Sequence, residues 1–166
     1  MKIIATILCL FAITANAQNV LLNSKDLKSF IGNWNGRFEF VDYKDDKSVT
    51  VLQTKLDIKG AGDSLIMQYS ITEPGGKIVK QRESWKIVSN GEQLQDDKEI
   101  ADISDVIRDQ NTITITLDRK GADNNNPSMI RKTITLSGNS LVISKRVKYD
   151  AGGDYFLRHQ YTFRKS

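Results

Sequence analysis

The sequence predicts an all-β fold, a closed up-and-down antiparallel β-barrel of 8–10 strands with a short N-terminal capping helix. The first observation is that apolar and polar residues alternate with a period of two along most of the chain after Trp34. The second is that short turns rich in Gly, Asn and Asp separate the alternating stretches. The third is that neither a long amphipathic helix nor a Rossmann or P-loop glycine pattern interrupts them.

The short connections favour neighbouring antiparallel strands, because sequential strands joined by tight turns usually pair. A meander of this length is expected to close on itself, which removes the exposed edge strands. A two-sheet sandwich is the alternative, although its crossings need longer connections than most of those in this sequence.

Residues 1–17 are predicted to be a cleaved signal peptide. Lys2 supplies the positive start, residues 3–14 form an apolar run, and Ala15-Asn16-Ala17 forms a small-x-small cleavage site. The run is too short to cross a bilayer of about 30 Å as a helix, which disfavours a retained anchor. We therefore expect one domain, residues 18–166, exported to the periplasm or secreted.

Cysteine and charge limit the function classes further. Cys9 is the single cysteine and lies within the apolar run behind bulky residues, which disfavours lipoprotein processing. The mature domain then depends on an ordinary hydrophobic core instead of disulfides. The formal net charge is +4, with 24 Lys and Arg against 20 Asp and Glu, and the charges are interspersed. This pattern suits solvated strand faces, so neither nucleic-acid binding nor membrane insertion is expected, and it does not indicate the oligomeric state.

A short helix is predicted over residues 24–31, with Ser24 as its cap and Gly32 in the left-handed position at its end. Its apolar face would carry residues at a helical spacing: Leu27, Phe30 and Ile31. Such a short helix is stable only when it is docked on a larger structure, so we expect it to cover one end of the barrel.

Two stretches are harder to place on the strand pattern. Residues 92–109 are expected to hold short, irregular strands near 99–103 and 105–108. Residues 121–127, with three consecutive asparagines, are expected to be a solvated loop. The last strand is predicted to present alternate residues to the interior: Tyr155, Leu157, His159, Tyr161 and Phe163.

The predicted inner faces also carry five polar or charged residues: Gln81, Glu83, Lys132, Lys145 and His159. Burying an unpaired charge costs several kcal/mol, so an open, partly wet cavity would accommodate them best. Its apolar walls would come from six residues: Phe38, Phe40, Met67, Tyr69, Trp85 and Tyr149. Apolar walls with a few orienting polar groups are typical of a site for a small hydrophobic or amphipathic ligand. The alternative is a bulge that shifts the register and turns the polar residues to solvent.

A short helix, then Gly32-Asn33-Trp34 at the start of the first strand, then a meander, resembles the calycins. The lipocalin-like proteins of the small exported bacterial type are the closest fit. The resemblance implies that the Gly-x-Trp motif lies at the closed end of the barrel, beneath an arginine from the last strand. Arg164 is the first candidate for that arginine and Arg158 the second, so Gly32, Trp34 and Arg164 are expected to be structural.

The resemblance also brings a second function into view. Some calycin relatives, the nitrobindin-like barrels, hold haem through a histidine near the C-terminal strand, and His159 has a similar position. A hydrogen-bonded or partly exposed histidine is the alternative role for this residue. No other cofactor and no metal is expected.

Catalysis has little support in the sequence. The mature chain has no cysteine nucleophile, no G-x-S-x-G elbow and no cluster at metal-ligand spacing. Glu83 with Lys132 or Lys145 could form an acid–base pair, but an ion pair that orients a ligand is the expected role, so we expect no enzyme. A structural or protein-binding module, its barrel filled by side chains, is the remaining alternative.

Overall fold

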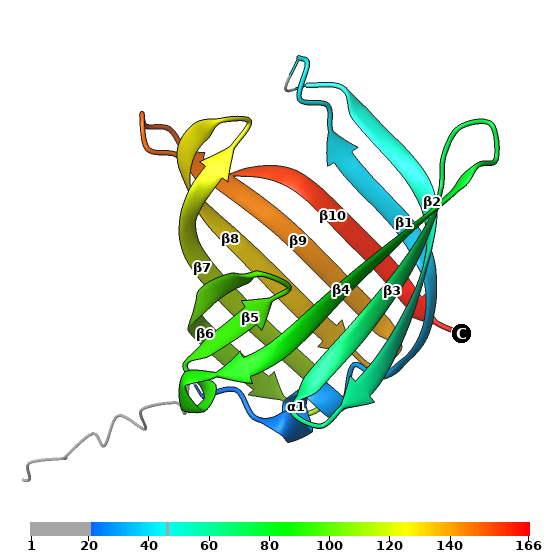
Figure 1. Ribbon diagram of the computed structural model, residues 1–166, viewed down its shortest axis with the longest axis vertical. Helices are drawn as coiled ribbons and strands as arrows, with labels where there is room; N and C mark the ends of the chain where they lie inside the picture. Colours follow the sequence, from blue (N-terminus) through cyan, green and yellow to red (C-terminus); the bar gives the residue numbers. More distant parts are fainter. Residues whose placement is uncertain (1–20, 46) are drawn as a thin grey trace, which may run out of the picture.

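The computed structural model describes residues 21–45 and 47–166, which form one closed barrel of ten antiparallel strands (Figure 1). Each strand pairs with its neighbours in sequence, and β1 pairs with β10 to close the ring. The predicted up-and-down barrel is therefore confirmed. The predicted signal peptide, residues 1–17 with Cys9, lies outside the described residues.

The elements follow one another with short connections. The helix α1 spans Ser24–Lys28, and a 3-10 turn spans Ser89–Gly91. The strands are β1 (Gly32–Val41), β2 (Val49–Ala61), β3 (Ser64–Thr72), β4 (Ile78–Val88), β5 (Gln93–Asp96), β6 (Glu99–Asp109), β7 (Thr112–Asp123), β8 (Asn126–Ser137), β9 (Ser140–Tyr149) and β10 (Phe156–Lys165). No helix among the described residues has the length and apolar character needed to cross a membrane.

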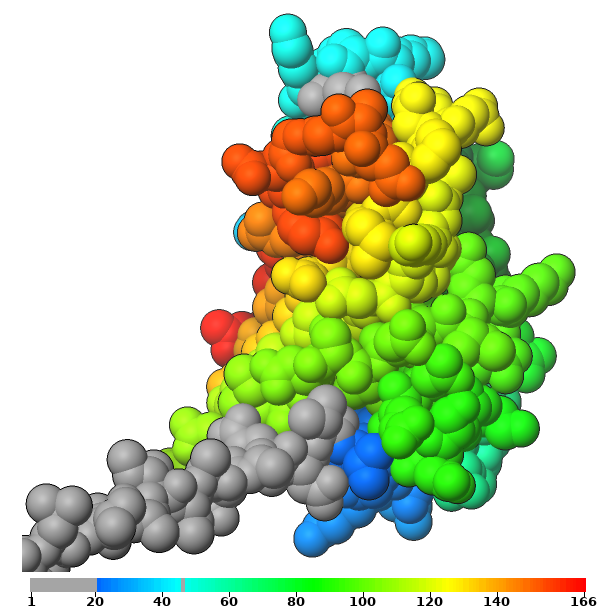
Figure 2. Space-filling model, turned by 90° about the vertical axis from the view of Figure 1, so that its left-hand side faces the viewer, coloured from blue at the N-terminus to red at the C-terminus, as the bar shows by residue number. Residues whose placement is uncertain are grey.

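Helix α1 and the loop between β1 and β2 lie at opposite ends of the barrel (Figures 1 and 2). The predicted cap was misplaced by one residue, because Asn23 and not Ser24 caps the helix. The Asn23 side chain accepts hydrogen bonds from the backbone N–H groups of Lys25 and Asp26, and the Asp26 carboxylate accepts one from the backbone N–H of Asn23. Arg108 of β6 then binds the Asp26 carboxylate at 2.7 Å, which ties the helix to the wall.

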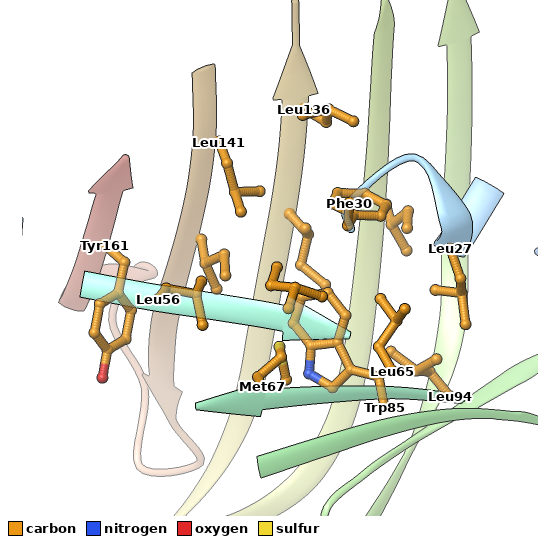
Figure 3. Packing of buried hydrophobic residues seen from close by; sticks show 14 of the residues in the cluster. Leu27, Phe30, Leu56, Leu65, Met67, Trp85, Leu94, Leu136, Leu141 and Tyr161 are labelled. Carbon is orange, nitrogen blue, oxygen red and sulfur yellow. The ribbon is translucent and has the colours of Figure 1, made fainter. Parts of the chain in front are cut away.

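A packed core fills the end of the barrel beneath α1 (Figure 3). Trp85 is fully buried and lies among Leu65, Met67 and Leu94, while Phe30 packs edge-on against its indole at 6.1 Å. This core buries the apolar face of a helix that would be unstable alone.

Trp34 anchors the same end, but the cation above it is not the expected arginine. The indole N–H donates to the Phe30 carbonyl at 3.1 Å, and Lys165 Nζ lies 5.3 Å from the ring centroid. Arg164 was predicted for this position, yet it is exposed and pairs with Asn35. The reason is strand parity, since Lys165 shares the inner face with Trp34 and Arg164 points the other way.

Gly32 begins β1 and has a φ of +145°, so it is not the left-handed end of the helix. A Cβ at this position would lie 2.9 Å from Lys165 Cε, within the space that the lysine needs to reach Trp34. Gly32 therefore keeps a structural role, although a different one from the role expected.

Two local features change the predicted strand pattern. Residues 121–127 are not a loop, because β7 and β8 meet in a tight hairpin in which Asn124 and Asn125 both have positive φ. Asparagine tolerates that conformation, which a two-residue type I′ turn requires. In β10 a bulge between Leu157 and His159 changes the direction in which the side chains before it point. Phe156 and Arg158 therefore face inward in place of Tyr155 and Leu157.

Candidate ligand-binding site

The barrel encloses a cavity of about 600 Å³. It lies between the packed core under α1 and the opposite end, and every strand except β2 contributes residues to it. The lining residues are Phe38, Tyr69, Gln81, Arg82, Glu83, Asp96, Asp97, Lys98, Glu99, Ala101, Leu117, Arg119, Ile130, Lys132, Ile143, Lys145, His159 and Tyr161.

One wall of the cavity is aromatic. Phe38 of β1 stacks on Tyr161 of β10 with ring centroids 4.3 Å apart, and Tyr69 of β3 lies 5.1 Å from Tyr161. Burial raises the pKa of both tyrosines, so their hydroxyls stay protonated and can donate hydrogen bonds. Ile143 adds aliphatic surface beside them. This wall offers a flat apolar surface with hydroxyl groups at its edge.

A partly buried ion pair lies on another wall, at the boundary with the core. Lys132 Nζ of β8 donates to Asp96 Oδ2 at 2.5 Å, and the indole N–H of Trp85 donates to the other carboxylate oxygen at 3.0 Å. Lys132 also lies 5.5 Å from the centroid of the Trp85 ring. Asp96 therefore fixes the position of the ammonium group from strand β5, across the barrel from β8.

Glu83 of β4 brings a second carboxyl group to the cavity. Gln81 Nε2 donates to its Oε1 at 2.7 Å. Burial raises the pKa of Glu83; the charge of Lys132 opposes this change, and the carboxylate of Asp96 adds to it. Glu83 is thus a carboxyl group in the cavity wall that loses its proton less readily than an exposed glutamate does.

Three nitrogen-bearing side chains form a row across β8, β9 and β10. Lys132 is paired in register with Lys145, and Lys145 with His159. Burial, together with the charges of Lys145 and Lys132, lowers the pKa of His159 to about 3. The imidazole is therefore neutral at physiological pH and stands in a positive local field.

Asp123 occupies the end of the cavity opposite α1. Its Oδ1 accepts hydrogen bonds from Lys145 Nζ at 3.0 Å and from the Tyr43 hydroxyl at 3.2 Å, and its Oδ2 lies 2.7 Å from Arg158 Nη2. The guanidinium group is sandwiched between the rings of Tyr43 and Phe156, at 4.4 and 4.8 Å. Burial raises the pKa of Asp123, but its bonds with these cations outweigh burial, and the net change is a lowered pKa. The cluster closes part of this end.

The cavity reaches solvent beside the short hairpin of β5 and β6. Strand β4 pairs with β5 only from Trp85 to Val88, and β6 pairs with β7 only as far as Asp118. Where this pairing stops, the cavity has its mouth. Charged residues of the lining surround the mouth: Arg82, Asp97, Lys98, Glu99 and Arg119. Glu99 and Arg119 form an ion pair across this rim. A small molecule therefore has a polar route to an apolar interior.

Most of the residues predicted for the site come together in the cavity: Phe38, Tyr69, Gln81, Glu83, Lys132, Lys145 and His159. Four others lie outside its lining. Met67 and Trp85 belong to the packed core. Phe40 stacks on Phe38 at 5.2 Å, and Tyr149 accepts a hydrogen bond from Arg158.

The sequence reading missed the carboxylates and the arginine that hold the polar groups in place. Asp96 lies in the stretch without clear alternation, and Asp123 lies in the segment expected to be a loop. Arg158 was considered only as a partner for Trp34, because the β10 bulge that turns it inward leaves no signal in the alternation. Tyr161 was placed on the inner face and could have been chosen from its position beside His159.

Comparison with known proteins places the fold. No protein-family model matches the chain, and no curated protein matches it in sequence. Rv2717c from M. tuberculosis has a similar structure, with a TM-score of 0.62, 12% identity and coverage of 86% of this chain and 96% of that one. The S-type phycobiliprotein lyase CPES from Guillardia theta gives a TM-score of 0.59 and 8% identity, with coverage of 87% and 93%. Lobster apocrustacyanin A1 gives a TM-score of 0.45 and 10% identity, with coverage of 86% and 63%. The first two structures show that the chain has the fold of a calycin-like β-barrel.

Proposed function

We propose that this protein binds a small hydrophobic or amphipathic molecule in its barrel cavity, without catalysing a reaction. The observation that carries the proposal is the cavity of about 600 Å³, with an aromatic wall facing a polar one. Known ligand pockets range from about 300 to 1,000 Å³ and combine apolar surface with a few polar groups. The predicted signal peptide suggests that the protein acts outside the cytoplasm.

The aromatic wall and the polar wall would contribute to binding in different ways. Contact with Phe38, Tyr69 and Tyr161 would remove apolar ligand surface from water, at about 25 cal/mol for each Å². Lys132 and Glu83 would fix the orientation of a polar group, since each is already held by a neighbouring side chain. A site held in place before binding loses less entropy when the ligand enters.

The proposal can be tested with a probe that fluoresces in apolar surroundings, N-phenyl-1-naphthylamine. We expect saturable binding to the unmodified protein, and binding at least tenfold weaker in Ala101→Phe. Ala101 is buried and lines the cavity, so a phenyl ring there takes up space that a ligand needs. Fluorescence titration measures both affinities.

Ile100→Phe is the matched control, because Ile100 is the neighbouring residue on β6 and its side chain is 55% exposed on the outer face. It should bind the probe as the unmodified protein does. Equal probe binding in Ala101→Phe, with its circular dichroism unchanged, would mean that the ligand site is not this cavity.

Haem binding is a second candidate, because His159 lines the cavity and its imidazole is neutral, as an iron ligand must be. Bound haem would supply the iron chemistry, and His159 would be its protein ligand. In that case added haemin gives an absorption band that His159→Ala removes. If haemin does not displace the naphthylamine probe, haem binding in the cavity is excluded and only the small-molecule proposal remains.

A further inference from the structure

We propose that the molecule in the cavity carries an acidic group, which binds between Lys132 and Lys145. This inference rests on the proposed function and narrows the class of ligand to small acids with an apolar body. It is carried by the position of the two lysines, by the hydrogen-bond donors they still have, and by the neutral histidine beside them.

The two lysines face each other directly. Lys132 on β8 and Lys145 on β9 are register partners with inward side chains, and both line the cavity. Residues paired in this way have Cβ atoms about 5 Å apart, and like charges at such positions destabilise a sheet. The interior therefore holds two like-charged side chains at neighbouring positions, and their ammonium groups extend toward opposite ends of the cavity, so an anion between them would be attracted to both.

Each ammonium group has donors left over. Among the described residues, Lys132 Nζ donates to Asp96 and Lys145 Nζ to Asp123. An ammonium group has three N–H donors, so the carboxylates leave two on each lysine. Both side chains are about one-fifth exposed, at 18% and 19%, and the surface they expose lines the cavity. The carboxylates anchor the two lysines from opposite ends and leave the space between them to a ligand.

His159, the third member of the row, favours an acidic ligand over a basic one. His159, opposite Lys145 on β10, is neutral and can donate one N–H to the same group. Glu83 faces the cavity without a direct ion pair among the described residues, and its pKa is raised by burial. When it is protonated, Glu83 can also donate a hydrogen bond to an acid. Asp96 and Asp123 offset the charges of the two lysines, but Asp123 is shared with Arg158, so these five groups together carry one net positive charge.

The test compares three competitors that share one bicyclic body: 2-naphthoate, 2-naphthamide and 2-naphthylmethylammonium. Each displaces N-phenyl-1-naphthylamine from the protein in a fluorescence titration. We expect 2-naphthoate to bind about tenfold tighter than the amide, and the ammonium compound to bind weakest. Decanoate in the same assay distinguishes an alkyl acid from an aromatic one.

Lys145→Gln locates the acidic group. This variant should lose the preference for 2-naphthoate over the amide, so that the two compounds displace the naphthylamine at similar concentrations. Lys148→Gln is the matched control, since Lys148 is exposed on the outer face of the same strand, and it should keep the preference. If Lys145→Gln does not fold, the same comparison of competitors is made with Lys132→Gln.

The outcomes separate this inference from the proposed function. Binding of the naphthylamine with no preference among the three competitors would overturn the acidic group and leave the cavity proposal standing. Tightest binding of the ammonium compound, lost in Glu83→Gln, would assign the polar wall to a base instead. No binding of any probe would overturn both.

Discussion

At the scale of single residues, His159 reports on the cavity most simply. It is the one histidine in the chain, and it lies between the aromatic wall and the lysine row. The centroid of its ring lies 5.6 Å from that of Phe38 and 5.9 Å from that of Tyr161, and both pairs are arranged edge to face. Burial disfavours a charged imidazole, and protonation would also place a third cation beside Lys145 and Lys132, so the pKa of His159 is low.

We predict that the His159 ring does not titrate between pH 8 and pH 5. Its pKa in the folded protein is about 3, against 6.5 for a free histidine. Because the unfolded chain takes up a proton near pH 6.5 and the folded chain does not, the free energy of unfolding should fall as the pH drops below 6.5. The maximum slope from this residue is about 1.4 kcal/mol per pH unit.

Proton NMR of the single histidine measures this pKa directly. A midpoint near 6.5 would place the ring in solvent and remove it from the cavity. An acidic ligand beside Lys145 should raise the pKa, because it offsets the positive charge that now lowers it.

At the scale of elements, closure of the barrel depends on the seam between β1 and β10. Gly36 lies opposite Phe163 at this seam. A Cβ at this position would stand 2.0 Å from the Thr162 carbonyl oxygen and 2.8 Å from Phe163 Cα. Both atoms belong to the backbone, so the two strands cannot both keep their places if a side chain is added.

Gly36→Ala should therefore destabilise the protein by about 3 kcal/mol, the upper part of the range for overpacked sites. Urea unfolding followed by circular dichroism measures the change. Gly60→Ala is the control, because the atom nearest to its Cβ is the flexible end of Ile31 and the expected loss is under about 1 kcal/mol. Equal stability of the two variants would show that the seam is looser than the structure indicates.

The elements also show what a sequence can and cannot predict here. Alternation placed Gln81, Glu83, Lys132 and Lys145 on the inner face correctly, because these strands run without a break in register. The bulge before His159 is invisible to that method, since it arises where β10 bends to meet β9. Likewise, the alternation of inward and outward side chains at the end of β10 places Lys165 over Trp34.

The same limit applies to β5, β6 and the hairpin of β7 and β8. One or two short, irregular strands were expected near residues 99–103 and 105–108, and both ranges belong to β6, a single strand with an irregularity between Ile103 and Asp105. Asp96 and Asp123 sit where the periodic signal is weak, so their pairing with the lysines depends on three-dimensional closure. Sequence therefore predicts the barrel and one wall of the site, but not the partners that hold its charges.

At the scale of the whole molecule, the barrel has one packed end and one hollow half. The core under α1 (Figure 3) provides the stability of the fold, and the cavity on its other side contains the charged residues. Asp123 and Arg158 close part of the far end, and the short β5–β6 hairpin leaves a charged mouth in the wall. This division explains how a chain of this size can keep both a stable core and a space for a ligand.

The central claim is that the interior of the barrel is a binding site, and methyl NMR with 2-naphthoate tests it most directly. Ile130 and Ile143 line the cavity, whereas Ile78 and Ile107 are exposed on the outer face. We predict saturable shifts of the first two methyl signals and none of the last two. Shifts confined to the outer isoleucines, or no shifts at all, would contradict the claim.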